Sequence, residues 1–201
     1  MPGRLTAQHW IDFALTTLAR EGFDALKADV LARKLGISRG SFYWHFTGLD
    51  AFHARVIDHW KQTATEAIIA DIERYESREQ RLDALLRRAF GHGAALEISM
   101  RTWAENNAEA ARAVSDIDRR RRGYLEQLLV EAGIAPPAAA TRAQLLYWTY
   151  LGAALSRSRI TGERLDRIVA ELEQIGLAGL TGRPAAIERS HERRPSRGRR
   201  G

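Results

Sequence analysis

Apolar residues recur every three or four positions along almost the whole chain, and no stretch alternates strictly between apolar and polar residues. A spacing of three to four places side chains on one face of an α-helix, whereas alternation is typical of a β-strand. The sequence therefore predicts an all-α fold of about nine helices.

The N-terminal part divides into three short helices. Thr6 is the expected N-cap of a first helix that ends at Gly22, because hydroxyl side chains begin helices and glycine ends them. A second helix is predicted at about 27–35 and a third at 39–45. The intervening Gly36-Ile37-Ser38 segment is a tight turn, in which Ser38 caps the third helix.

The remaining helices are longer. Thr47 is the expected N-cap of a fourth helix over about 48–73, whose buried stripe is Phe52, Val56, Ile57, Trp60, Ala64, Ala67, Ile68 and Ile72. Further helices are predicted at about 78–91, 94–105, 107–132, 138–157 and 162–177. Asn107 and Thr161 are expected N-caps, Gly133 is a helix stop, and Pro136-Pro137 separates two long helices. A short turn near Thr161 makes the last two helices an antiparallel hairpin.

The charge of the chain is uneven. The net charge is +6, but seven arginines and two glutamates lie between Gly182 and Gly201, so the rest is nearly neutral. Overall charge therefore does not indicate a nucleic-acid partner. Residues 181–201, rich in arginine, glycine and proline, are predicted to be a disordered and solvated tail, with a DNA-binding arm as the alternative.

Several classes of protein are excluded. There are no cysteines, no apolar run close to the ~20 residues of a membrane span, and no signal-peptide core at the N-terminus, so a cytoplasmic protein without membrane contact is expected. There is no serine elbow and no phosphate loop, and His53 and His59 do not share a helical face. We therefore expect no enzyme activity, catalytic residue, metal ligand or cofactor.

Three short helices, of which the second and third are separated by a three-residue turn that contains glycine, are the minimum needed to read a DNA major groove. In the third helix Phe42 and Phe46 share an inward face, whereas Arg39 offers a forked guanidinium suited to guanine and Gly40 permits close backbone approach. The outward and flanking positions are Ser41, Tyr43, Trp44 and His45. An alternative is that Tyr43, Trp44 and His45 only pack between the third and fourth helices.

The run from Leu35 to Phe46, LGISRGSFYWHF, preceded by Val30-Leu-Ala32, resembles the signature of the tetracycline-repressor (TetR) family, over about residues 5–60. The resemblance implies that Arg39, Gly40, Ser41 and Trp44 approach bases and that Tyr43 and His45 hold phosphates. Lys27 occupies a position where members usually carry a threonine that contacts the DNA backbone. Leu49 replaces a phosphate-binding lysine, and Asp29 a polar or basic residue.

The resemblance further implies a transcriptional regulator, by default a repressor, that binds a palindromic operator as a homodimer and is released by a small-molecule effector. A helix-turn-helix head (1–48) would precede a ligand-binding and dimerisation body (49–180). An alternative, favoured by Leu49, is a helical dimeric interaction protein that has lost specific DNA binding.

Candidate residues in the body follow from side-chain type. The ligand-binding candidates, each of which could instead be ordinary core, are Trp60, Phe90, His92, Met100, Trp103, Tyr147 and Trp148. The candidates for the dimer interface are Leu145, Leu146, Trp148, Thr149, Gly152 and Ala153. Arg119–Arg122 is interpreted as a solvated helical face.

Overall fold

The computed structural model of the chain describes residues 5–156 and 160–179, and these ranges contain helices, turns and loops but no strand. The α-helices are α1 (Ala7–Glu21), α2 (Ala28–Leu35), α3 (Gly40–Tyr43), α4 (Leu49–Lys61), α5 (Ala67–Ile72), α6 (Arg78–Gly91), α7 (Ala95–Ala104), α8 (Ala108–Glu131), α9 (Pro136–Leu155) and α10 (Gly162–Leu177). A 3₁₀ turn, η1 (Phe23–Ala25), follows α1, and a π-turn, η2 (Gln62–Glu66), joins α4 to α5. Counting α4, η2 and α5 as one continuous rod confirms the prediction of an all-α fold of about nine helices.

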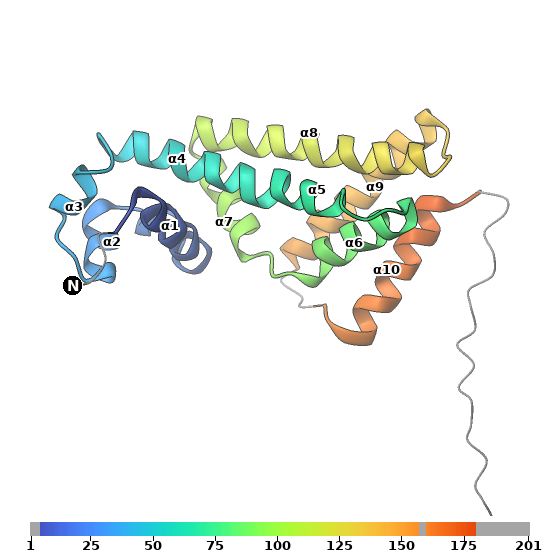
Figure 1. The fold of residues 1–201 in the computed structure, drawn as a ribbon, viewed down its shortest axis with the longest axis horizontal. Helices are drawn as coiled ribbons and strands as arrows, with labels where there is room; N and C mark the ends of the chain where they lie inside the picture. Colours follow the sequence, from blue (N-terminus) through green and yellow to red (C-terminus); the bar gives the residue numbers. More distant parts are fainter. Residues whose placement is uncertain (1–4, 157–159, 180–201) are drawn as a thin grey trace, which may run out of the picture.

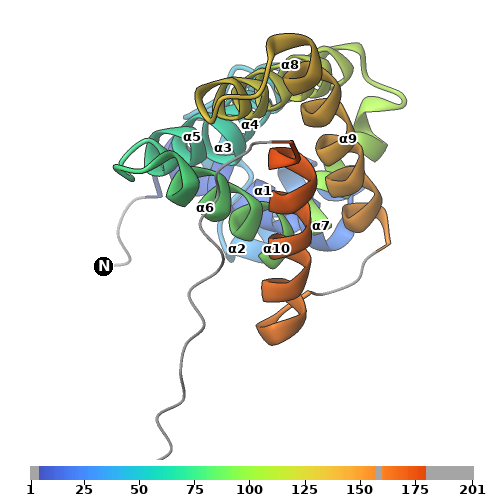
Figure 2. The same cartoon turned by 90° about the vertical axis from the view of Figure 1, so that its right-hand side faces the viewer.

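The molecule has a small head and a larger body. The head consists of α1, α2 and α3, and the rod formed by α4 and α5 leads from it along α8 into the body (Figure 1). The helices α9 and α10 lie side by side (Figure 2), and Arg142 of α9 donates a hydrogen bond of 2.9 Å to the carbonyl oxygen of Gly176 near the end of α10. This pairing confirms the predicted antiparallel hairpin, although its connecting residues 157–159 lie outside the described part of the chain.

Several predicted helix ends are confirmed. The Thr6 hydroxyl accepts from the backbone N–H of His9, and the side chain of Asn107 accepts from that of Ala110. Gly22 adopts φ 79°, and its N–H donates to the carbonyl of Leu18 at 3.0 Å. These contacts satisfy backbone groups that a helix end leaves open.

Three predictions about the helices are wrong. The N-cap of α4 is Gly48, not Thr47, and it makes no side-chain capping bond. Pro136 and Pro137 do not lie outside the helices but form the first turn of α9, where a missing N–H costs nothing. Ala67 is exposed and Ile69 is buried, because the π-turn inserts an extra residue and rotates the following face of the rod.

The core has two main parts. One apolar cluster begins in the head with Trp10, Leu31 and Phe42 and continues without a break into α7 and α8, and a second joins α6, α8, α9 and α10. The head is therefore packed firmly on the near end of the body. Within the described ranges no helix is long and apolar enough to cross a membrane, and no group of three or more metal-ligating side chains was found.

Candidate DNA-binding surface and ligand cavity

Helix α3 is fixed to the head by one aromatic side chain. Phe42 is fully buried, and its ring centroid lies 5.4 Å from that of Trp10 and 5.1 Å from those of Phe46 and Phe52. Edge-to-face and tilted aromatic pairs at these distances each add about 0.5–1.5 kcal/mol beyond the burial of apolar area. A helix of four residues has little stability of its own, so its position depends on these contacts.

The turn before α3 sets its direction. Gly36 adopts the left-handed conformation, with φ 69° and ψ 29°, at the end of α2. The N–H of Ile37 then donates to the carbonyl of Ala32 at 3.0 Å, which closes the end of α2. The Ser38 side chain makes no capping bond; the residue at the N-cap of α3 is Arg39, without a side-chain bond.

The opposite side of α3 faces solvent. Tyr43 is 50% exposed and Trp44 is 79% exposed, so the alternative in which both only pack between helices is wrong for these two residues. The Arg39 guanidinium donates to the Tyr43 hydroxyl at 2.9 Å and lies 5.5 Å from its ring centre. The hydrogen bond to Tyr43 raises the pKa of Arg39, which keeps this cation charged and pre-oriented.

The other predicted contact residues lie around this pair. Lys27 is exposed at the N-cap of α2, and Gly40 is exposed in α3, whereas Ser41 and His45 are half-buried. A Cβ added at Gly40 would meet only the Ser38 hydroxyl, at an ordinary 3.7 Å. Packing within the protein therefore does not require glycine here. Leu49 is 38% exposed in the first turn of α4.

The body contains a cavity of about 860 Å³ between the rod formed by α4 and α5, the helices α6, α7, α8 and α9, and the end of α1. Of the predicted ligand-binding residues, Trp60, Phe90, His92 and Tyr147 line it. The volume lies within the range of small-molecule sites, and apolar side chains dominate the wall.

The structure places the other three candidates elsewhere. Met100 and Trp103 are buried in the cluster that joins the head to the body, where Trp103 stacks on Phe23 at 4.6 Å between ring centres. Trp148 is 60% exposed on α9. A pattern of apolar residues in a helix does not distinguish a cavity wall from solid core, which is why these residues were assigned wrongly.

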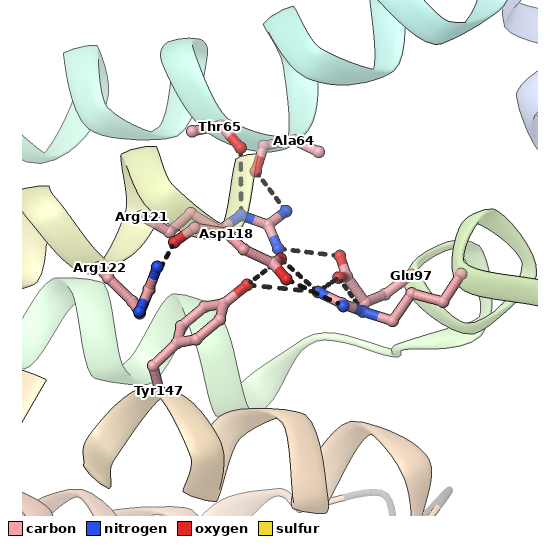
Figure 3. Close-up of polar contacts among 8 residues, drawn as sticks. Ala64, Thr65, Glu97, Asp118, Arg121, Arg122 and Tyr147 are labelled. Atoms are coloured by element: carbon pink, nitrogen blue, oxygen red, sulfur yellow. Dashed lines mark hydrogen bonds and ion pairs between the residues drawn. The ribbon is translucent and has the colours of Figure 1, made fainter. Parts of the chain in front are cut away.

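A half-buried network of ion pairs (Figure 3) contributes Glu97, Arg121 and Tyr147 to the wall of the cavity. Arg121 donates to one oxygen of the Glu97 carboxylate at 2.9 Å, and Arg101 donates to the other at 2.7 Å. Arg101 also binds Asp118, which accepts from the Tyr147 hydroxyl at 2.7 Å. The network thus balances two cations with two anions, as buried charges require.

Arg121 also holds the π-turn. Its guanidinium donates to the Thr65 hydroxyl at 3.1 Å and to the carbonyl oxygen of Ala64 at 3.0 Å. The interpretation of Arg119–Arg122 as a solvated face is therefore wrong for Arg121, although Arg119 is exposed. The signal that could have identified it is Glu97, the one acid of α7, which lies among the apolar residues Leu96, Ile98 and Met100.

The network determines the protonation of its neighbours. Burial is the largest single influence on Arg121 and lowers its pKa, but the charges of Glu97, Tyr150 and Tyr147 and the hydrogen bond to Glu97 together outweigh burial and raise that pKa. Burial also raises the pKa of Tyr147, and it raises that of Tyr150 to about 12. The two arginines therefore remain charged and the two phenols neutral at physiological pH.

One face of α9 is apolar and exposed. Leu145, Trp148, Gly152 and Leu155 follow one another at intervals of three or four, and Leu145, Trp148 and Leu155 are 48%, 60% and 63% exposed. Two residues expected on this face lie elsewhere: Leu146 is only 2% exposed and Ala153 lines the cavity. They point inward because they lie about 100° from their exposed neighbours on the helix.

The sequence of the head matches those of known regulatory proteins. Residues 11–54 match the family model described as bacterial regulatory proteins, tetR family. A segment of 43 residues is 44% identical to the HTH-type transcriptional regulator SrpR of Pseudomonas putida and equally to TtgW, an uncharacterized HTH-type transcriptional regulator of the same species. This segment is 21% of the chain, and it spans 20% of the length of SrpR and 32% of that of TtgW.

The whole described fold also has solved counterparts. A transcriptional regulator from Rhodococcus sp. Rha1 superimposes with a TM-score of 0.70 over 86% of this chain and 95% of that one, at 21% sequence identity. Such low identity establishes the fold and nothing more specific. Residues 11–54 therefore resemble the DNA-binding part of the TetR family of bacterial regulatory proteins, and the rest of the described chain shares the fold of the Rhodococcus regulator.

Proposed function

We propose that this protein is a DNA-binding transcriptional regulator, a repressor that a small-molecule effector releases from its operator. The observation that carries the proposal is the two-sided character of α3. Phe42 is fully buried, while Arg39, Tyr43 and Trp44 lie on the outer surface. A helix fixed on one side and bearing a guanidinium and aromatic rings on the other is suited to the major groove.

The individual contacts are proposed as follows. Arg39, Gly40, Ser41 and Trp44 approach base edges, and Lys27, Tyr43 and His45 bind phosphates. Ser41 and His45 are half-buried, so each has part of its surface available to DNA. Because Arg39 and Tyr43 are hydrogen-bonded to each other, we expect them to engage DNA as one unit.

The active form is proposed to be a homodimer. The exposed apolar face of α9, with the half-exposed Ile175 of α10, is a suitable interface. A twofold axis would present two α3 helices to successive major grooves of a palindromic operator, about 34 Å apart. An effector in the cavity would favour a dimer in which this spacing is lost.

Division of labour along the chain follows from this function. We assign DNA binding to residues 1–48, ligand binding and dimerisation to 49–180, and the connection to the rod formed by α4 and α5; the arginine-rich residues 181–201 lie outside the described part of the chain. A regulator of bacterial genes acts in the cytoplasm, which is where we place it.

The test is fluorescence anisotropy with DNA that flanks the protein's own gene. Arg39→Ala and Tyr43→Ala are each expected to abolish specific binding while circular dichroism stays unchanged, because both side chains are exposed. Arg74→Ala is the control, since Arg74 is also exposed and lies in the turn that follows α5, away from α3. Absence of binding at low salt by the unmodified protein would contradict the proposal and favour the interaction protein without specific DNA binding.

A further inference from the structure

The two ends of the cavity differ in chemistry. Its inner wall is mainly apolar and buried, with Ile69, Leu86, Phe90, Leu125 and Leu146, and the ion-pair network occupies one side of it. The lining residues that reach solvent, and so mark its opening, include Arg20, Arg88 and His92. The cavity is thus an apolar space with a basic entrance.

One of the two arginines belongs to the head. Arg20 lies in the last turn of α1, and its neighbours Ala19 and Gly22 also line the cavity. Within the part of the chain that the structure describes, the Arg20 guanidinium makes no hydrogen bond or ion pair. It is a cation at the opening that no side chain of the described residues neutralises.

The other arginine belongs to the body and is held in place. Arg88 of α6 donates to Nε2 of His92 at 2.8 Å, and Nδ1 of His92 lies 3.0 Å from the carbonyl oxygen of Arg88. Because arginine can only donate, Nε2 accepts, and the imidazole proton sits on Nδ1. The neutral imidazole therefore orients Arg88 without neutralising its charge.

No acid among the described residues that line the opening offsets these charges. Among the described lining residues Glu97 is the one carboxylate, and it is already bound by Arg101 and Arg121 on the inner wall. An anion at the entrance would face two cations, whereas a cation would be repelled.

We propose that the cavity binds a monomeric amphiphile with an anionic headgroup, a carboxylate or a phosphate. The headgroup lies between Arg20 and Arg88, and the apolar chain lies along the inner wall. The inference rests on the proposed function, and it adds a mechanism: because Arg20 belongs to the head and Arg88 to the body, the bound headgroup would link the two parts.

The first test measures ligand affinity by isothermal titration, with sodium decanoate below its micellar concentration as the probe. Decanol and decylamine, of equal chain length, are expected to bind more weakly, by about tenfold or more. Arg20→Gln and Arg88→Gln should each weaken decanoate binding by about five- to tenfold and leave decanol unchanged, and Arg20→Lys should retain most of the affinity. Arg119→Gln, an exposed arginine outside the cavity, is the control.

Equal binding of decanoate and decanol, or an equal loss of both in the glutamine variants, would overturn the proposal. The source of the ligand is tested by co-sedimentation with phosphatidylglycerol vesicles. We expect no sedimentation with these vesicles, since a ligand held inside the body must leave the bilayer, and binding to them would overturn the monomeric ligand.

The second test separates this inference from the proposed function. Saturating decanoate should change the operator affinity of the unmodified protein but not that of Arg20→Gln, which lacks the contact with the head. An equal response in both proteins would overturn the bridging role of Arg20. Operator binding that does not respond to decanoate would overturn the ligand inference and leave the proposed function intact. If the protein without ligand does not bind the operator, the proposed function itself is overturned.

Discussion

The head is densely packed, whereas the body contains a cavity. In the head, aromatic rings fill the space around α3, and Trp10, Phe42 and Phe52 are all fully buried. In the body, the helices surround a cavity of about 860 Å³, and a half-buried network of ion pairs contributes to its wall. A surface that must match DNA requires a rigidly held helix, and dense packing around α3 provides it. A site that must admit a ligand requires empty space, which the body provides at the expense of dense packing.

The largest effect is expected from breaking the head. Phe42→Ala removes the ring on which α3 rests and should lower the free energy of unfolding by about 3–5 kcal/mol. Urea denaturation followed by circular dichroism measures the change. The adjacent Tyr43→Ala is the control and should cost far less, because half of its side chain is exposed. Similar losses in both variants would contradict the role assigned to Phe42.

A smaller loss is expected from breaking the network in the body. Glu97→Gln leaves Arg101 and Arg121 close together without their shared anion, and it should cost about 2–3 kcal/mol in the same denaturation experiment. The control is Glu163→Gln, in a side chain that is 90% exposed. The prediction fails if Glu97→Gln is as stable as that control.

The raised pKa of Tyr150 predicts sensitivity to alkali. The unfolded chain releases this phenolic proton near pH 10, whereas burial raises the pKa of Tyr150 to about 12 in the folded protein. The stabilisation is therefore present below pH 10 and is lost as the pH rises through 12. Tyr150→Phe should reduce the loss of stability between pH 10 and 12 by about 1–2 kcal/mol, as measured by urea denaturation across that range. Tyr75→Phe, at an exposed site, should leave the loss unchanged.

The smallest effect concerns the edge of the DNA-binding surface. Leu49→Lys adds a cation to an exposed position in the first turn of α4 and should steepen the plot of log affinity against log salt by about one unit. Anisotropy titrations between 50 and 200 mM salt, on the order of physiological ionic strength, measure the slope. Leu49→Gln is the uncharged control. An identical slope in both variants would show that this position does not reach a phosphate.

The sequence predicted the head better than the body, for a physical reason. The head is specified by residues close together in the sequence: the left-handed turn favours glycine at position 36, and Phe42 and Phe46 share one helical face. The cavity and the network depend on distant residues, so Arg121 looked like one of four solvated arginines although it meets Glu97, 24 positions away. The sequence does not predict the π-turn, because the spacing of apolar residues along the rod does not reveal that one residue has been inserted.

That inserted residue has a consequence for how the two regions communicate. One extra residue in a continuous helix rotates the part that follows it by about 100° about the helix axis. The buried face of α5 is therefore rotated by this angle from the position that it would have if α4 continued as a regular helix. Removing a single residue from Gln62–Glu66 would bring the ends back into step and turn the head about the axis of the rod. Such a one-residue deletion would change the direction in which α3 points, and it would also disrupt the apolar cluster that joins the head to the body.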